Sequence, residues 1–194
     1  STPIKSSAAS DVYKRQFYER AGYVQNLNGS DGSVTIIGAV SPQGGDFSEP
    51  VTQNTKRFVR CFLALDKSLA YARHYPAINW LTSYSEYIPD LTAWYETNVG
   101  PTFVQCRNEI LNLLTMENRL NEIVKLIGSD VLPDDQKLVL EIARVIRLGF
   151  LQQNAFHKED TYVPMEKQLL NPLLHRCSAQ KSGKALANPL FTPG

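Results

Sequence analysis

The chain has 194 residues, a formal net charge of +1 and 43% hydrophobic residues. This length suits one ordinary domain or two small ones, and the apolar content is typical of a globular protein. The small net charge gives no reason to expect nucleic-acid binding, and no apolar run approaches the roughly 20 residues that span a bilayer. No signal peptide is visible either, so we expect a cytoplasmic protein without direct membrane insertion.

The three cysteines, Cys61, Cys106 and Cys177, are far apart in the sequence. A metal site would need paired cysteines or histidines at short spacing. We therefore expect reduced, buried cysteines and no metal site. The three histidines have no catalytic partner at a recognisable spacing, and we assign them no chemistry.

Residues 34–40 form a short run of apolar and β-branched residues, which predicts a buried strand. Ser41 and Pro42 end this run, and a glycine pair follows, where the backbone can take positive φ. We therefore expect a stiff, acidic loop after the strand, at a sheet edge that a partner can touch.

After this loop, apolar residues recur at helical spacing, which predicts a helix with Thr52 or Asn54 as its cap. Pro76 disfavours helical geometry at Tyr75, so the chain should leave the helix before that point. The apolar positions of this predicted helix are Phe58, Phe62, Leu65 and Leu69.

A boundary is expected at Pro89 and Asp90, and the remainder should be helical. Apolar residues predict a helix over residues 104–127 with Gly128 as its C-cap, and Pro133 should open another helix. The expected inner face of this second helix consists of Leu138, Ile142, Val145, Ile146 and Gly149.

Three charged residues lie on the second of these helices. Arg144 and Arg147 are three residues apart, and Glu141 is near them. We expect solvent-facing salt bridges, each worth less than about 1 kcal/mol.

The exact residue sequences of several segments are more informative than the secondary structure that they predict. Residues 33–50 read SVTIIGAVSPQGGDFSEP. The segments FYERAG, VTQNT, RHYPAINW, EIVKLIG and FLQQNAFH also occur, and all of them follow the order that they have in one known family. Together they resemble the catalytic A subunit of the V/A-type rotary ATPases, in its bacterial or archaeal branch. The rotor-facing loop of that family reads SPxGGDFSEP. The resemblance runs from about Phe17 to about Gln168.

The resemblance implies an α/β plus all-α organisation. Residues 17–88 would be the terminal part of a P-loop (RecA-like) nucleotide domain, and residues 89–168 a carboxy-terminal helical bundle. Residues 1–16 match nothing in the family, and we expect a non-native leader there. Residues 169–194 are rich in Lys, Ser, Gly and Pro, and we expect a disordered or non-native tail.

No GxxxxGK[ST] phosphate loop occurs in the sequence. That motif uses glycines to wrap backbone N–H groups around the phosphates and a lysine to meet them. The family's magnesium ligands also lie upstream of the matched region. The resemblance therefore implies a carboxy-terminal fragment that carries no catalytic residue and is inactive alone. The complete protein would bind ATP or ADP with magnesium.

Three aromatic residues are candidate nucleotide ligands. From the sequence alone, aromatic residues at such spacing are typical of a core. In the family, however, the aromatic of RH[FY]PAINW stacks on adenine, and aromatics of the FLQQNAF region close the pocket. The adenine-binding residues that the resemblance implies are Tyr75, Phe150 and Phe156.

The glycine-rich loop is a second candidate site. From the residues alone it is a tight turn with a solvated acid. The resemblance implies contact with the central rotor stalk, with Asp46 facing basic side chains and the glycines allowing close approach. The implied rotor contacts are Ser41, Pro42, Gln43, Gly44, Gly45 and Asp46.

The implied parent protein couples ATP hydrolysis or synthesis to proton or sodium transport. It would alternate with the non-catalytic B subunit in a hetero-hexamer, which is cytoplasmic and attached to the membrane through the complex. Two alternatives stay open: the non-catalytic, nucleotide-binding B-type subunit itself, and a free-standing helical interaction module with no enzymatic role.

Overall fold

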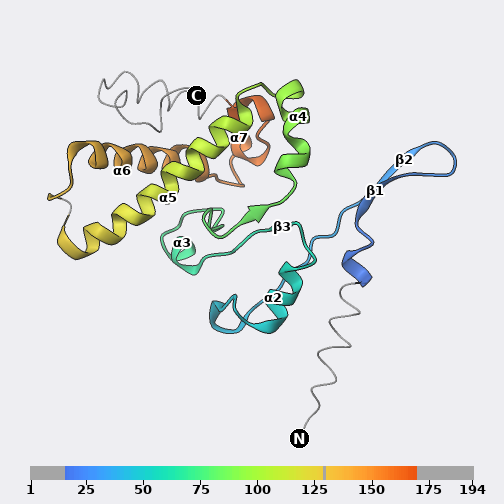
Figure 1. Ribbon diagram of the computed structural model, residues 1–194, viewed down its shortest axis with the longest axis horizontal. Helices are drawn as coiled ribbons and strands as arrows, with labels where there is room; N and C mark the ends of the chain where they lie inside the picture. The colour runs from blue at the N-terminus through green and yellow to red at the C-terminus, as the bar shows by residue number, and fades with distance from the viewer. Residues whose placement is uncertain (1–15, 129, 170–194) are drawn as a thin grey trace, which may run out of the picture. The chain divides into compact units, whose positions relative to one another are not determined.

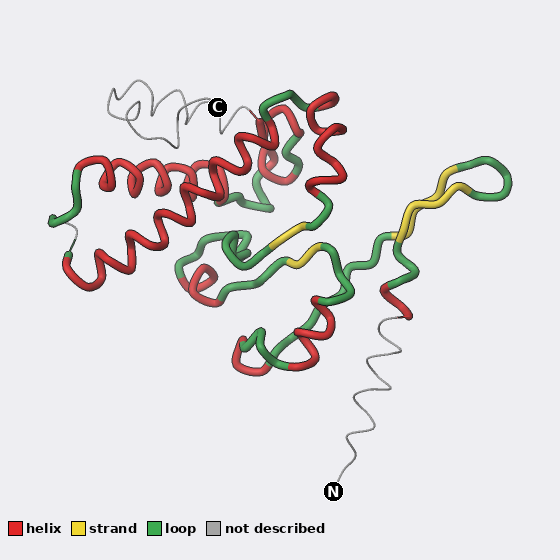
Figure 2. The backbone as a smooth tube through the Cα atoms, viewed as in Figure 1, coloured by secondary structure: helices red, strands yellow, loops and turns green. Residues whose placement is uncertain are grey.

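The structure is a computed structural model that describes residues 16–128 and 130–169. The chain divides into two compact units between Phe62 and Leu63. The elements follow one another as drawn in Figure 1, and Figure 2 shows that the strands are short and that helices make up most of the second unit. The expected leader and tail lie almost entirely outside the described residues.

The first unit begins with an antiparallel hairpin. β1 (Gly22–Gln25) pairs with β2 (Asp31–Val34), with Gly22 opposite Val34 and Gln25 opposite Asp31. In the connecting turn, Gly29 has a φ of 81°, and the N–H of Asn26 donates to the carbonyl of Ser30 at 2.7 Å. Glycine suits this position because it takes positive φ without steric cost.

The predicted buried strand over residues 34–40 is wrong. β2 ends at Val34, and the following residues are irregular. The side chains of Val34 and Ile37 are 56% and 95% exposed. A strand needs a neighbouring strand to pair with its backbone, and neither small sheet of the described chain includes residues 35–40.

The predicted helix through residues 58–69 is also wrong. The helix α2 (Pro50–Lys56) starts and ends earlier, and Glu49 rather than Thr52 or Asn54 is its N-cap. Pro50 favours this early start because its fixed φ suits a first helical turn. The strand β3 (Cys61–Phe62) follows, and the Phe62 ring packs edge-on against Phe47, with centroids 5.7 Å apart, instead of forming a helix face.

The second unit starts with short elements. α3 (Lys67–Tyr71) is capped by Asp66, whose carboxylate accepts a hydrogen bond from the N–H of Ser68 at 2.8 Å. The chain leaves helical geometry at Ala72, which confirms the expected end before Pro76. β4 (Tyr84–Ser85) follows.

The remaining described elements are helical, as expected. α5 runs within one residue of its predicted start and ends at Gly128, which has a φ of 86° and donates its N–H to the carbonyl of Val124 at 2.9 Å. Pro133 directly precedes α6, and Pro89 lies in the first turn of α4. The labelled helices are α4 (Ile88–Asn98), α5 (Phe103–Ile127), α6 (Asp134–Ile146), the π-helical turn η2 (Arg147–Leu151) and α7 (Lys158–Thr161), and residues 165–169 are also helical.

The core of this unit lies between α5 and α6, which pack against each other and cross at an angle in Figure 1. In the predicted inner face of α6, Ile146 is buried and Ile142 is partly buried. The prediction is wrong at Val145, which is 48% exposed, and at Gly149, which is exposed. Residues 138–146 are apolar at most positions, so the spacing alone leaves the rotation of the helix undetermined. The buried core residues are Leu113, Leu114, Leu120, Leu132, Val139, Ala143 and Ile146.

The cysteines follow the expectation only in part. Cys106 is buried and Cys61 is exposed, and both are free thiols. Cys61 is exposed because it lies in β3 rather than on the inner face of a helix. Cys177 lies outside the described residues. None of the helices in residues 16–128 and 130–169 combines the length and apolar character that a membrane crossing requires.

Candidate functional site

The glycine-rich loop is a tight turn. Gly44 and Gly45 have φ angles of 67° and 78°, a region that other residues rarely enter. The N–H of Gly45 donates to the carbonyl of Pro42 at 3.2 Å. Both glycines are exposed, and a Cβ built on either of them would meet no atom within 4 Å. The expected positive φ at the glycine pair is confirmed.

Asp46 stabilises the second half of this loop. Its Oδ1 accepts hydrogen bonds from the N–H and the hydroxyl of Ser48, at 2.9 and 2.6 Å. This is the local turn that aspartate side chains favour. The two hydrogen bonds lower the pKa of Asp46 below its ordinary value, so the exposed carboxylate carries its charge at neutral pH.

The loop is anchored within its own unit. Besides the contact of Phe47 with Phe62, the side-chain amide of Gln53 donates to the carbonyl of Phe47 at 2.7 Å. The ammonium of Lys56 lies 5.0 Å from the centroid of the Phe62 ring. The sequence GGDFSEP therefore encodes a turn, an aromatic anchor and a helix start in succession.

The three candidate adenine-binding residues differ in exposure. Tyr75 is 53% exposed and Phe156 is 99% exposed, whereas Phe150 is partly buried and packs against the α5–α6 core. The N–H of Gln153 donates to the carbonyl of Tyr75 at 2.7 Å. This hydrogen bond joins the segment of Tyr75 to the loop that separates Phe150 from Phe156.

The loop that carries Phe156 is held by side-chain hydrogen bonds. The N–H of Phe156 donates to Oδ1 of Asn154 at 3.0 Å, and the N–H of Asn154 donates to Oδ2 of Asp160 at 2.9 Å. The hydroxyl of Thr161 also donates to the carbonyl of Ala155 at 3.0 Å. These hydrogen bonds fix the backbone of the loop on which the apolar ring of Phe156 is exposed.

A partly buried ion pair joins α5 to η2. The spacing of charges along the sequence did not predict this pair. Glu117, which is 4% exposed, pairs with Arg147 at 2.9 Å. Glu117 falls at helical spacing among the core leucines of α5, and this acid on an apolar face was the available signal. The expected surface salt bridge is confirmed for Arg144 with Glu141 at 3.7 Å, and the expectation for Arg147 is wrong.

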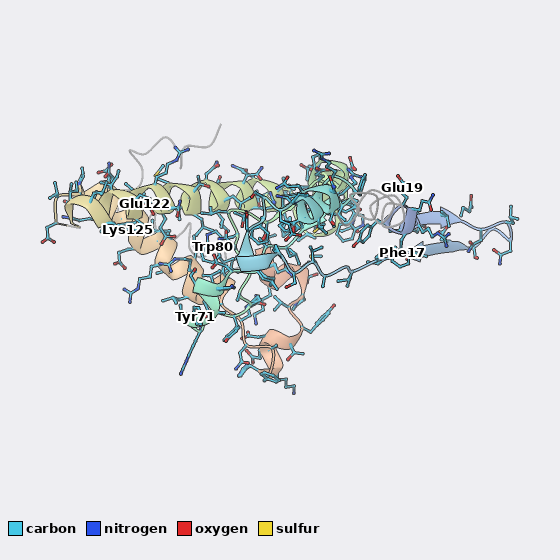
Figure 3. All side chains as sticks on the ribbon, turned by 90° about the horizontal axis from the view of Figure 1, so that it is seen from below. Phe17, Glu19, Tyr71, Trp80, Glu122 and Lys125 are labelled. Atoms are coloured by element: carbon cyan, nitrogen blue, oxygen red, sulfur yellow. The ribbon has the colours of Figure 1, made fainter. Side chains whose placement is uncertain are left out.

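The side chains of His74 and Trp80 pack against each other. Their rings meet edge to face with centroids 5.5 Å apart, and Trp80 lies close to α5 in Figure 3. Burial, and after it the positive charge of Arg147, lower the pKa of His74 from its ordinary value, which favours the neutral imidazole. Within the part of the chain that the structure describes, no group of three His, Cys, Asp or Glu is placed to hold a metal.

The sequence matches two family models in succession. Residues 6–85 match the nucleotide-binding domain of the ATP synthase alpha/beta family, and residues 92–182 match the C-terminal domain of V and A type ATP synthase. These two domains give the chain a nucleotide-binding part followed by a helical C-terminal part.

Two similar curated relatives are named as the alpha chain or the A subunit of an ATP synthase. V-type ATP synthase alpha chain 2 of Clostridium tetani is 69% identical over 153 residues, and the A subunit of the A-type ATP synthase of Methanosarcina mazei is 60% identical over 153 residues. This chain is homologous to the A subunit of V- and A-type ATP synthases. The match covers 79% of this A-subunit homologue and 26% of each relative, so the chain spans about a quarter of their length.

A solved structure supports the fold of this A-subunit homologue. The ATP synthase subunit NeqB from Nanoarcheaum equitans superposes with a TM-score of 0.72 at 19% identity. The similarity covers 87% of this chain and 40% of that chain. The resemblance to A subunits that the sequence motifs indicate is confirmed by the curated relatives.

Proposed function

We propose that this chain forms part of the catalytic A subunit of a V/A-type ATPase or ATP synthase, which couples ATP hydrolysis or synthesis to proton or sodium transport. Its contribution is the adenine pocket, formed by Tyr75, Phe150 and Phe156. The observation that supports this most is the nearly complete exposure of Phe156 on a loop hydrogen-bonded to the segment of Tyr75.

Stacking on these rings suits adenine because the base is a flat π system. Each stacked ring contributes roughly 1–3 kcal/mol, by analogy with base stacking on nucleic-acid-binding proteins. In this proposal the α/β part belongs to a P-loop (RecA-like) domain. The phosphates and magnesium are bound by other parts of the catalytic protein, since this sequence contains no GxxxxGK[ST] motif.

The loop of residues 41–46 is the proposed contact with the central rotor stalk. The open space around Gly44 and Gly45 allows a partner backbone to approach closely, and Asp46 offers it an exposed negative charge. The complete protein would alternate with B subunits in a hetero-hexamer on the cytoplasmic side of the membrane.

The A-subunit assignment is favoured over the B-type alternative by the names of the relatives, which describe them as alpha chains or A subunits. The similarity to NeqB concerns the fold and does not separate the two. In a free-standing helical module, the exposed ring of Phe156 would have no nucleotide to bind. The nucleotide experiment below distinguishes that alternative.

The test replaces Phe156 with alanine in a full-length protein. Residues 17–168 are grafted in place of the matched segment of the Clostridium tetani alpha chain, and the complex is assembled. Loss of one stacked ring should raise the KM for ATP roughly tenfold, equivalent to about 1.4 kcal/mol. The kcat should change less, because the phosphates react far from the base.

Two controls accompany this variant. Tyr75→Phe should leave the KM close to wild type, because the ring face makes the contact. Tyr71→Ala removes an aromatic residue that is 86% exposed and belongs to no proposed pocket, so it should leave the KM unchanged. An unchanged KM in Phe156→Ala would contradict the adenine pocket.

A further inference from the structure

Glu117 occupies a position where a carboxylate is costly. It lies on the face of α5 that buries Leu113, Leu114 and Leu120. Removing a charge from water is unfavourable unless a partner of opposite charge compensates for it. The position would therefore suit a leucine as well, and the acid calls for an explanation beyond core packing.

Arg147 compensates this charge from a distant part of the chain. Its Nε and Nη2 atoms both lie 2.9 Å from Oε1 of Glu117, so two nitrogens of the guanidinium hold one carboxylate oxygen. Charge-assisted hydrogen bonds of this kind fix direction as well as distance. The pair connects the middle of α5 to the first residue of η2, 30 positions later.

The turn that Arg147 begins is π-helical. The N–H of Gln152 donates to the carbonyl of Arg147 at 2.9 Å, five residues back. π-helical turns are rare and are frequently found at functional sites. This turn carries Phe150 and leads into the loop of Phe156.

The same arginine also lies beside the segment of Tyr75. Its charge acts on His74, which is 7% exposed and packs against Trp80. Together with the hydrogen bond from Gln153 to Tyr75, this places the ion pair next to both segments that carry the exposed rings.

We infer that Glu117 is a positioning residue for nucleotide binding: by holding Arg147 at the start of η2, it fixes the orientation of Phe150 and Phe156 relative to Tyr75. This inference rests on the adenine pocket proposed above. Glu117 touches no nucleotide in this arrangement and acts only through Arg147.

The test separates positioning from stability in the same assembled chimaeric complex. In the double variant Glu117→Leu/Arg147→Met, an apolar pair replaces the ion pair, a change that proteins often tolerate without loss of stability. We expect a melting temperature close to wild type, a KM for ATP raised roughly fivefold and a kcat close to wild type. Inhibition by inorganic tripolyphosphate, which lacks a base, should be unchanged.

Two single variants keep the test decisive. Glu117→Gln keeps the shape and an acceptor oxygen but loses the charge, and it should raise the KM even if the double variant does not assemble. Glu122→Gln is the matched control, because Glu122 forms an exposed ion pair with Lys125 at 2.7 Å near the end of the same helix (Figure 3). It should leave both the KM and the melting temperature unchanged.

The outcomes are distinct. A wild-type KM in the double variant, or in Glu117→Gln when the double variant does not assemble, would overturn the inference, whatever happens to the melting temperature. If Phe156→Ala raises the KM while the Glu117 variants do not, only the positioning role fails. If none of these variants changes the KM, the adenine pocket fails and the positioning role fails with it.

Discussion

Apolar side chains are exposed in the segment from β1 to β3, but they are buried between the helices α5 and α6. In the first, Tyr23, Leu27 and Ile37 are 71%, 110% and 95% exposed, whereas Leu114 and Ala143 in the second are at most 1% exposed. A helix satisfies its backbone hydrogen bonds internally, so two helices can bury one face against each other. A strand needs neighbouring strands to satisfy its backbone hydrogen bonds.

The largest effect is expected in the helical core. Leu114→Ala should lower the free energy of unfolding by about 2–5 kcal/mol, because it removes buried methyl groups and leaves a cavity. Urea denaturation measures this change. The matched control is Leu126→Ala, at a position 84% exposed on the same helix, which should change stability by less than about 0.5 kcal/mol. Equal effects at the two positions would break the comparison.

A smaller effect should follow from His74. Its pKa is lowered in the folded state by burial and by Arg147, so between the two pKa values the unfolded chain binds more protons than the folded chain. Stability should therefore decrease as the pH falls through the ordinary histidine pKa of about 6.5 toward the lowered pKa of the folded state. The free energy of unfolding at each pH, measured for wild type and His74→Gln, provides the check. An equally steep decrease in the variant would show that another group is responsible.

The smallest effect is expected in the first unit. Ile37→Ala should change the free energy of unfolding by less than about 0.5 kcal/mol, since the side chain is almost fully exposed in this chain. The same substitution in the full-length chimaeric protein sharpens the comparison. A loss there of more than about 1 kcal/mol would indicate that residues 34–40 become covered in the larger protein.

Sequence reasoning succeeded where local interactions decide the structure. The length of α5, its end at Gly128 and the start of α6 after Pro133 all follow from spacing and capping residues. The positive φ of Gly44 and Gly45 was equally predictable from residue type. These features depend on residues only a few positions apart.

It failed where distant residues decide the outcome. The apolar run at 34–40 resembles a strand, but pairing partners determine whether it forms one. Phe62 fits a helical spacing, but Phe47 engages it in a different contact. The pairing of Glu117 with Arg147 spans 30 residues, so no local pattern reveals it. The adenine-binding residues came from family resemblance rather than from spacing, and they remain a prediction.

The π-helical turn η2 has a consequence for how this region can vary. A π-helical turn holds one residue more than the α-helical turn that it replaces. Substitutions leave the number of residues unchanged, whereas deletion of a single residue would rotate the following chain by about 100°, the angle between successive residues of an α-helix. Variation by substitution can therefore reshape the surface around Phe150 gradually, but a one-residue change in length there would redirect the whole loop at once.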